Sequence, residues 1–241
     1  MDFDYKDLNI IYEDNHIIVV VKPQGIPSQQ DKSGDVDMLT LIKRYLIDKY
    51  NKPGNAYVGL VHRLDRPTGG VMIFAKTSKA ADRLHESLMN GEIEKSYLTV
   101  VSGTPRMPHE RLEDYLQKYE SLNIVKVVPP TTKGSKKAIL DYTVLDTKED
   151  CSLLWVKLET GRSHQIRVQL SNIGNPLLGD VKYGPSKSRC PYNLALWSAE
   201  LRIVHPTTKE KMVFRVYPDQ DQYPFSLFDL DMFLRITMNN N

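Results

Sequence analysis

The order of strand-like and helix-like segments is the feature that most limits how this 241-residue chain can fold. Short apolar runs are mixed with three segments whose apolar residues recur at helical spacing. Strands and helices do not alternate strictly, and this is typical of an α+β fold rather than of a parallel βαβ array. We therefore expect one α+β domain on a mixed, largely antiparallel sheet that is flanked by helices and loops and carries an active-site cleft.

Two of the helix predictions rest on capping residues as well as on spacing. Residues 37–50 are predicted to form a helix with Asp37 as its N-cap. Residues 78–90 are predicted to form a second helix, with Ser78 as its N-cap and Gly91 just past its end.

The strand-like runs are rich in β-branched and aromatic residues and are bounded by turn signals. Their order predicts three hairpins, at 8–23 with a turn at Asp14-Asn15, at 136–160 with a turn at 148–150, and at 194–218, and single strands at 71–75 and 95–101. Residues 102–135 are expected to be basic loops that lead into the second hairpin.

Composition excludes several classes of protein. No apolar run approaches the ~18 residues that a membrane span requires, and the polar, acidic start does not resemble a signal peptide. Cys151 and Cys190 stand far apart without a second pair, which argues against a zinc framework and is typical of a reducing cytosol. The six histidines show no metal-binding spacing, and no phosphate-binding glycine loop is present. We expect neither a metal nor a cofactor.

The distribution of charge is more informative than its total. The formal net charge is +2, but the acidic stretch from Pro218 onward hides a net of +5 in residues 1–217. Residues 161–190 alone carry five basic side chains, Lys187 and Arg189 among them, against one acidic residue. A local basic surface is what attraction to phosphate requires, although a solvated charged face has the same composition.

The segment VHRLDRPTGG, residues 61–70, is the strongest candidate for chemistry. It places Asp65 between Arg63 and Arg66 in a stretch that Pro67 and two glycines prevent from being regular. An ionised aspartate can attack a sugar carbon, and nearby arginines keep its pKa low. An aspartate at such a position can also simply cap a turn, so these residues alone leave both interpretations open.

A partner for Asp65 is sought in a third predicted helix, residues 163–173, which ends before Gly174 and Pro176. Ile166, Leu170 and Ile173 would form its buried face. Arg167 lies three residues after His164, so the two share another face near the helix start. Arg167 is either the partner of Asp65 or an ordinary surface arginine.

Five segments, which follow one another in the family's order along the chain, resemble the RluA-type pseudouridine synthases. VHRLDRPTGG is similar to the HRLDxxTSG motif of that family, and IIYEDNHIIVVVKPQGIP is similar to its opening hairpin with a Lys-Pro pair. EKSYLTVVSG resembles the second motif, and TGRSHQIRVQLSNIGNPLLGDVKYG resembles the third. LALWSAELRIVHP is also similar to the final conserved strand. The resemblance covers residues 8 to 217.

The resemblance implies a reaction that converts uridine in RNA to pseudouridine without a metal, a nucleotide or another cofactor. Asp65 would start it, either by attacking C1′ or by removing the 2′ proton. Arg167 would pair with Asp65, and Tyr97 would pack on the base, whereas a half-buried tyrosine is also common in any strand.

The resemblance also implies substrate contacts. A base inside stacked RNA must be extruded before it can react. Arg63 stands at the position whose side chain fills the vacated space, a task that suits a planar guanidinium. Further contacts with RNA are expected from His62, Thr68, Arg162, His164 and Gln165, with His62 either contacting RNA or bracing the loop. Arg66 contacts phosphate or is plain surface.

Two positions depart from the family pattern. Gly69 replaces the usual serine after Thr68, and Trp197 replaces a common histidine. No S4-like domain precedes the motifs, so we expect a single catalytic domain over residues 1–241, with a core at 8–217 and a C-terminal extension at 218–241. The predicted protein is a cytoplasmic monomer that acts on ribosomal or transfer RNA.

Two other functions stay in view. One is a non-catalytic RNA-binding protein on the same fold, which the presence of Asp65 disfavours. The other is a carboxylate glycosidase, which requires a second acid. Glu94 has no motif support for that role.

Overall fold

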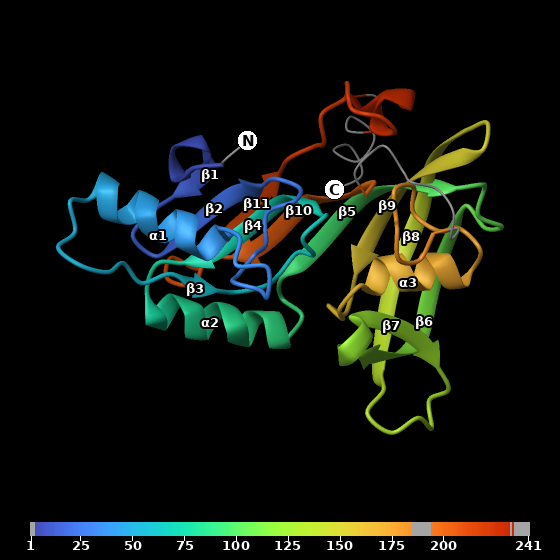
Figure 1. Cartoon of the computed structure of the whole chain (residues 1–241), viewed down its shortest axis with the longest axis horizontal. Coiled ribbons are helices and arrows are strands. Elements are labelled where there is room, and N and C mark those ends of the chain that lie inside the picture. Colours follow the sequence, from blue (N-terminus) through green and yellow to red (C-terminus); the bar gives the residue numbers. More distant parts are fainter. Residues whose placement is uncertain (1–2, 185–193, 232, 234–241) are drawn as a thin grey trace. The chain divides into compact units, whose positions relative to one another are not determined.

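A computed structural model describes residues 3–184, 194–231 and 233. Lys187, Arg189 and Cys190 lie outside these residues. The described part of the chain contains an eleven-stranded, largely antiparallel sheet and three α-helices, which confirms the predicted α+β class (Figure 1). No helix within the described ranges combines the length and the apolar character needed to cross a membrane.

The chain divides into two compact units, each built from two segments. The first unit comprises residues 1–95 and 198–216, and the second comprises 96–197 and 217–241. The chain passes from one unit to the other inside two strands, β5 (Glu94–Ser102) and β10 (Leu196–Val204). The prediction of one catalytic domain with an active-site cleft stays a prediction.

The first unit combines a small sheet with two helices. Its strands follow the order β1-β2-β4-β10, with β3 paired to β4 and β11 paired to β10. Besides β10, its elements are η1 (Tyr5–Asp7), β1 (Asn9–Glu13), β2 (Ile17–Lys22), α1 (Met38–Lys49), β3 (Gly59–Leu60), β4 (Gly69–Ala75), α2 (Ser78–Met89) and β11 (Lys211–Arg215).

The second unit contains long hairpins and one short helix. Its strands follow the order β5-β9-β8-β6-β7. Besides β5, its elements are β6 (His109–Tyr119), η2 (Glu120–Leu122), β7 (Ile124–Val128), β8 (Lys136–Lys148), β9 (Cys151–Leu158), α3 (Gln165–Asn172) and η3 (Phe225–Leu227).

The first predicted hairpin is confirmed, and its turn is held by one side chain. The Asp14 carboxylate accepts hydrogen bonds from the backbone N–H groups of His16 and Ile17, at 2.7 and 2.8 Å. An aspartate that bonds the backbone two and three residues ahead stabilises a tight turn. The other two predicted hairpins form as well, as β8–β9 and β10–β11.

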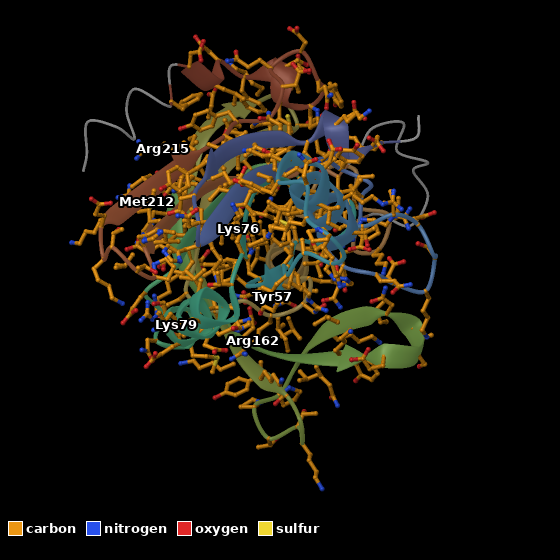
Figure 2. The ribbon with its side chains drawn as sticks, turned by 90° about the vertical axis from the view of Figure 1, so that its left-hand side faces the viewer. Tyr57, Lys76, Lys79, Arg162, Met212 and Arg215 are labelled. Carbon is orange, nitrogen blue, oxygen red and sulfur yellow. The ribbon has the colours of Figure 1, made fainter. Side chains whose placement is uncertain are left out.

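The β1–β2 hairpin is also tied to the rest of its unit by Glu13. The Glu13 carboxylate accepts hydrogen bonds from Lys49 at 2.7 Å and from Lys76 at 2.5 Å. Figure 2 shows Lys76 beside this hairpin. Burial alone would raise the pKa of Glu13, but these bonds and those from Tyr50 and Tyr45 lower it to about 2.

Alternation along β2 and β4 places their side chains in two buried layers. One layer packs against α2, where Ala80, Ala81 and Leu84 are buried. Successive residues of a strand point to opposite faces, so the remaining side chains of β2 and β4 point to the other face, where they are equally buried. The layer against α2 contains Ile17, Val19, Val71 and Ile73.

The capping predictions are confirmed at one helix and wrong by one residue at the other. The Asp37 side chain accepts a hydrogen bond from the Thr40 N–H at the start of α1. At α2 the N-cap is Thr77, not Ser78, because the Thr77 hydroxyl accepts the bond from the Ala80 N–H. Gly91 follows the end of α2 with a φ of 75°, as predicted.

The prediction of loops at 102–135 is wrong. Residues 109–119 and 124–128 form the hairpin β6–β7, and β6 also pairs with β8 along eight residues. Leu116 of β6 and Val125 of β7 are buried with Ala138 and with Val168 of α3. In Figure 1, α3 lies across this group of strands, so the hairpin supplies part of the surface on which α3 rests.

Candidate active site

The segment that carries Asp65 is a tight turn in the first unit. The Asp65 carbonyl accepts a hydrogen bond from the Thr68 N–H at 2.9 Å. Gly69 then begins β4, and Gly70 has a φ of 117°, a left-handed conformation that favours glycine. A Cβ at Gly70 would lie 2.2 Å from the Ser198 carbonyl oxygen, so the turn requires a glycine where β4 approaches β10.

The loop after β2 braces this turn from one side. The Ser28 hydroxyl donates to the Leu64 carbonyl at 2.8 Å and accepts from the Leu64 N–H at 3.1 Å. Gln24 donates to the Pro67 carbonyl at 2.9 Å. The backbone is therefore held at positions before and after Asp65 in the chain, while Asp65 itself is only half-buried.

Lys22, at the end of β2, lies beneath the turn. Its ammonium donates to the carbonyls of Pro23 and Arg66, at 2.9 and 3.1 Å, and the residue is fully buried. Burial lowers the pKa of Lys22 to about 7, although the negative charge of Asp65 acts in the opposite direction. Lys22 therefore interacts electrostatically with the Asp65 carboxylate from inside the protein.

The two arginines beside Asp65 behave differently. Arg66 turns back to the protein, with Nε donating to the Gly25 carbonyl at 2.8 Å and Nη2 paired with Asp35. Arg63 is exposed, and its guanidinium has no hydrogen bond or ion pair within the part of the chain that the structure describes. Of these two arginines, Arg63 presents its guanidinium to solvent without a partner among the described residues.

His62 and Thr68 are buried in the same turn. His62 Nε2 accepts a hydrogen bond from the Ile73 N–H at 3.3 Å. Burial lowers the pKa of His62 to about 3, and the charge of Lys95 adds to the shift. Among the described residues, His62 Nδ1 and the Thr68 hydroxyl are buried without a hydrogen-bond partner.

Arg167 belongs to the second unit and is buried, so the alternative of a surface arginine is wrong. Its Nε and Nη2 donate to the two carboxylate oxygens of Asp180, both at 2.7 Å. Asp180 also accepts from the backbone N–H groups of Lys182 and Tyr183. Burial alone would raise the pKa of Asp180, but Arg167 and these N–H groups hold it below its usual value.

Three further predicted site residues lie around the start of α3: Arg162, His164 and Gln165. Arg162 is exposed and donates through Nε to the Lys137 carbonyl at 2.9 Å. Gln165 is buried, accepts from the Thr160 hydroxyl at 2.8 Å and donates to the Ile139 carbonyl at 3.0 Å. These contacts fix the loop that leads into the helix.

The helix α3 begins at Gln165 and ends at Asn172, shorter than predicted. His164 is its N-cap, in a left-handed conformation with a φ of 54°, and its Nδ1 lies 2.6 Å from the Tyr183 hydroxyl. All residues from Gln165 to Leu170 are buried, whereas Ile173 is only half-buried. From Gln165 to Leu170 the helix is buried on every side rather than on one face, and its last two residues are more exposed.

Tyr97 lies in β5 and is 5% exposed, so it is a buried tyrosine rather than the half-buried one of the general alternative. Trp197, which replaces the common histidine, is half-buried in β10.

The structure thus gathers the predicted residues into two sets. His62, Arg63, Asp65 and Thr68 share one turn of the first unit, and Arg162, His164, Gln165 and Arg167 surround the start of α3 in the second. The predicted pairing of Asp65 with Arg167 would join the two units, and it stays a prediction.

Sequence reasoning missed four residues that position these groups: Lys22, Ser28, Asp180 and Tyr183. Lys22, Asp180 and Tyr183 lie inside segments that resemble the family. For Lys22 and Asp180, the available signal was a charged residue next to an apolar run. No group of three or more potential metal ligands occurs within the described ranges.

Comparison with known proteins shows which family the chain resembles. Residues 16–172 match the family model described as RNA pseudouridylate synthase, which is more than half of the chain. The Bacillus subtilis protein named "Uncharacterized RNA pseudouridine synthase YjbO" is 35% identical over 218 residues, covering 89% of this chain and 74% of that protein. The Zymomonas mobilis protein named "Ribosomal large subunit pseudouridine synthase D" is 33% identical over 226 residues, covering 89% of this chain and 70% of that protein.

A solved structure shares the fold. The chain named "Human RNA Pseudouridylate Synthase Domain Containing 1" superposes with a TM-score of 0.76 at 21% sequence identity. The superposition covers 98% of this chain and 96% of the human chain.

Proposed function

The chain belongs to the RNA pseudouridylate synthase family and is an isomerase that acts on RNA, and we propose that it converts specific uridines of structured RNA to pseudouridine with Asp65 as the initiating residue. The observation that carries the proposal is the braced turn. Hydrogen bonds to Leu64 and Pro67 fix the backbone around a half-buried carboxylate, and the buried ammonium of Lys22 interacts electrostatically with it.

The reaction breaks the N1–C1′ bond, turns the base and joins C5 to C1′. Asp65 starts it either by attacking C1′ or by removing the 2′ proton, and both routes require an ionised carboxylate near the sugar. A rigid turn suits either route, because a displacement of about 1 Å at a reacting group costs on the order of a hundredfold in rate.

Arg167 is proposed as the partner of Asp65. A guanidinium carries five N–H donors, and the pair with Asp180 engages only the edge formed by Nε and Nη2. Five donors allow a guanidinium to bind two carboxylates at once, which supports a role for Arg167 toward a second carboxylate. Asp180 would then hold Arg167 in place for its contact with Asp65.

The remaining site residues are proposed to act in two ways. Arg63 and Arg162 are exposed and would contact RNA, with Arg63 filling the space left by the extruded uridine. Tyr97 would pack on the base.

The other four predicted site residues are buried, and we propose that they shape the site rather than bind phosphate. Side-chain contacts with the backbone or with a neighbouring side chain support this role for His62, His164 and Gln165, and the backbone hydrogen bond from Thr68 to Asp65 supports it for Thr68.

We further propose ribosomal RNA as the substrate, with transfer RNA as the alternative. Two relatives at 33% identity, from Zymomonas mobilis and Haemophilus influenzae, carry the name ribosomal large subunit pseudouridine synthase D. A cytoplasmic location and action as a monomer are part of the proposal. Burial and the charges of Glu149 and Asp150 raise the pKa of the Cys151 thiol, which fits an unreactive cysteine in a reducing compartment.

Exchange of Asp65 tests the proposal against a non-catalytic RNA-binding protein. The Asp65→Asn variant keeps the shape of the side chain but loses the nucleophile. Tritium release from RNA that carries [5-³H]uridine should fall below detection, while RNA affinity stays within a few-fold of the original. Turnover at the original rate in this variant would remove Asp65 from the mechanism.

Pseudouridine mapping of cellular RNA with and without the protein identifies the substrate. Loss of sites from ribosomal RNA alone is expected, and loss from transfer RNA alone would replace the ribosomal assignment.

A further inference from the structure

Tyr183 connects Arg167 to the β6–β7 hairpin. Neither the resemblance to the family's motifs nor the proposed reaction gives this connection a role. Tyr183 follows Asp180 in the turn beyond α3. Its hydroxyl accepts a hydrogen bond from the Val125 N–H at 2.8 Å and lies 2.6 Å from His164 Nδ1. The Tyr183 hydroxyl oxygen thus contacts both β7 and His164, the N-cap of α3.

The ring of Tyr183 contacts the arginine itself. The Arg167 guanidinium carbon lies 5.2 Å from the centre of the ring, within the range of a cation–π contact. The His164 ring meets the Tyr183 ring edge-on, with centres 5.6 Å apart and planes at 72°. Asp180 fixes the guanidinium along one edge, and Tyr183 limits its motion perpendicular to the ring.

The contact on the hairpin side uses an edge of the sheet. β7 is the last strand of its order, and an edge strand presents backbone N–H groups that no neighbouring strand accepts. The Val125 N–H is directed to Tyr183. Lys182 adds a second link, because its ammonium donates to the Asn123 carbonyl at 2.8 Å, just before β7.

We propose that Tyr183 is a positioning residue that sets the orientation of the Arg167 guanidinium and makes it depend on the attachment of the β6–β7 hairpin. The proposal rests on the proposed function, in which Arg167 acts toward Asp65. The hairpin and the segment after it carry exposed lysines, so RNA that contacts them would act on the same connection. These are Lys118, Lys126, Lys133, Lys136 and Lys137.

Two substitutions separate the hydroxyl from the ring. Tyr183→Phe removes the hydrogen bonds of the hydroxyl with Val125 and His164 but keeps the ring that contacts Arg167, whereas Tyr183→Leu removes both. We expect the single-turnover rate constant on a uridine-containing stem-loop to fall about 10-fold in the first variant and about 100-fold in the second. The Kd for the RNA should change less than 3-fold in both.

A spectroscopic arm tests positioning without any turnover. The Nε–H signal of Arg167, assigned by its loss in Arg167→Lys, should be sharp and slow to exchange in the original protein. It should broaden or shift to the position of a mobile arginine in Tyr183→Leu. If the protein modifies no RNA supplied, the proposed function fails, and this signal still decides whether Tyr183 positions Arg167.

Tyr119 provides the matched control, because it also makes a cation–π contact but lies at the exposed end of β6. It is 38% exposed, and the Lys126 ammonium lies 5.6 Å from the centre of its ring. Tyr119→Phe and Tyr119→Leu should change the rate less than 2-fold and leave the Arg167 signal unchanged. An unchanged rate and an unchanged Arg167 signal in Tyr183→Leu would overturn the proposal. If Tyr183→Leu does not fold, Tyr183→Phe decides, and a rate and signal equal to those of Tyr119→Phe would overturn it.

Discussion

Removal of the Ser28 hydroxyl should loosen the turn that carries Asp65. In Ser28→Ala, the Leu64 N–H and carbonyl both lose their partner inside the protein. A buried backbone group left without a hydrogen bond costs about 1 to 3 kcal/mol, so a moderate value for each gives about 3 kcal/mol for the pair. For a chain of this length, this corresponds to a fall in Tm of about 6 to 12 °C.

Local and global assays should agree on this loss. Hydrogen exchange at the Leu64 amide should speed up by about 100-fold, since each 1.4 kcal/mol is a factor of ten. The turnover rate should fall by a similar factor, because Asp65 follows Leu64 directly. Ser33→Ala is the control: Ser33 also donates to a neighbour, the Asp31 carboxylate, but is exposed, and its loss should cost less than about 0.5 kcal/mol. If both variants lose the same small amount, the Ser28 brace does not hold the turn.

Three further predictions follow from the same turn. Arg63→Ala should slow modification of a stem-loop much more than modification of a short unstructured RNA with the same uridine context, in single-turnover assays; equal slowing would assign Arg63 to the loop instead. The pKa of His62 is about 3 in the folded protein and about 6.5 in the unfolded chain, so between these pH values the unfolded chain binds the extra proton. As the pH falls from about 6.5 to about 3, about 5 kcal/mol of stability is therefore lost. His62→Gln should flatten that part of the stability curve measured in urea, and an unchanged slope would contradict the assignment. Gly70→Ala should cost at least about 3 kcal/mol and reduce soluble yield, because its Cβ meets Ser198, whereas Gly54→Ala, which meets nothing within 4 Å, should cost only about 1 kcal/mol of backbone strain.

Elements with local signals could be predicted from the sequence. The β1–β2 hairpin has its turn residue, Asp14, between two apolar runs, and α1 has its N-cap, Asp37, before a helical pattern. Both signals act over four residues or fewer. The error at α2 has the same scale, since Thr77 and Ser78 are neighbours of equal capping ability and only the bond to Ala80 distinguishes them.

The β6–β7 hairpin could not be predicted in this way. Within β6, only Leu112 and Leu116 are buried apolar residues, and their spacing of four fits one face of a helix as well as one face of a strand. Pairing with residues of β8 that lie 20 to 34 positions further along the chain determines the strand.

The site shows the same division. Asp65 was found because its motif is continuous, and the burial of Arg167 was left open because it depends on Asp180 and Tyr183, which lie 13 and 16 residues further along the chain. The brace from Ser28 joins residues 36 positions apart, a separation at which spacing carries no information.

The division of the first unit between two segments has a consequence for how the protein is made. Synthesis delivers residues 1–95 early, but most of β10 and all of β11 emerge only after residues 96–197 of the second unit. Val71 and Ser198, which are hydrogen-bonded in the finished unit, are 127 positions apart. During that interval the edge of β4 that β10 later covers is a template for pairing with other chains. That edge stays unpaired until β10 has left the ribosome, so β4, which begins at the end of the Asp65 turn, is among the last strands to gain both of its neighbours.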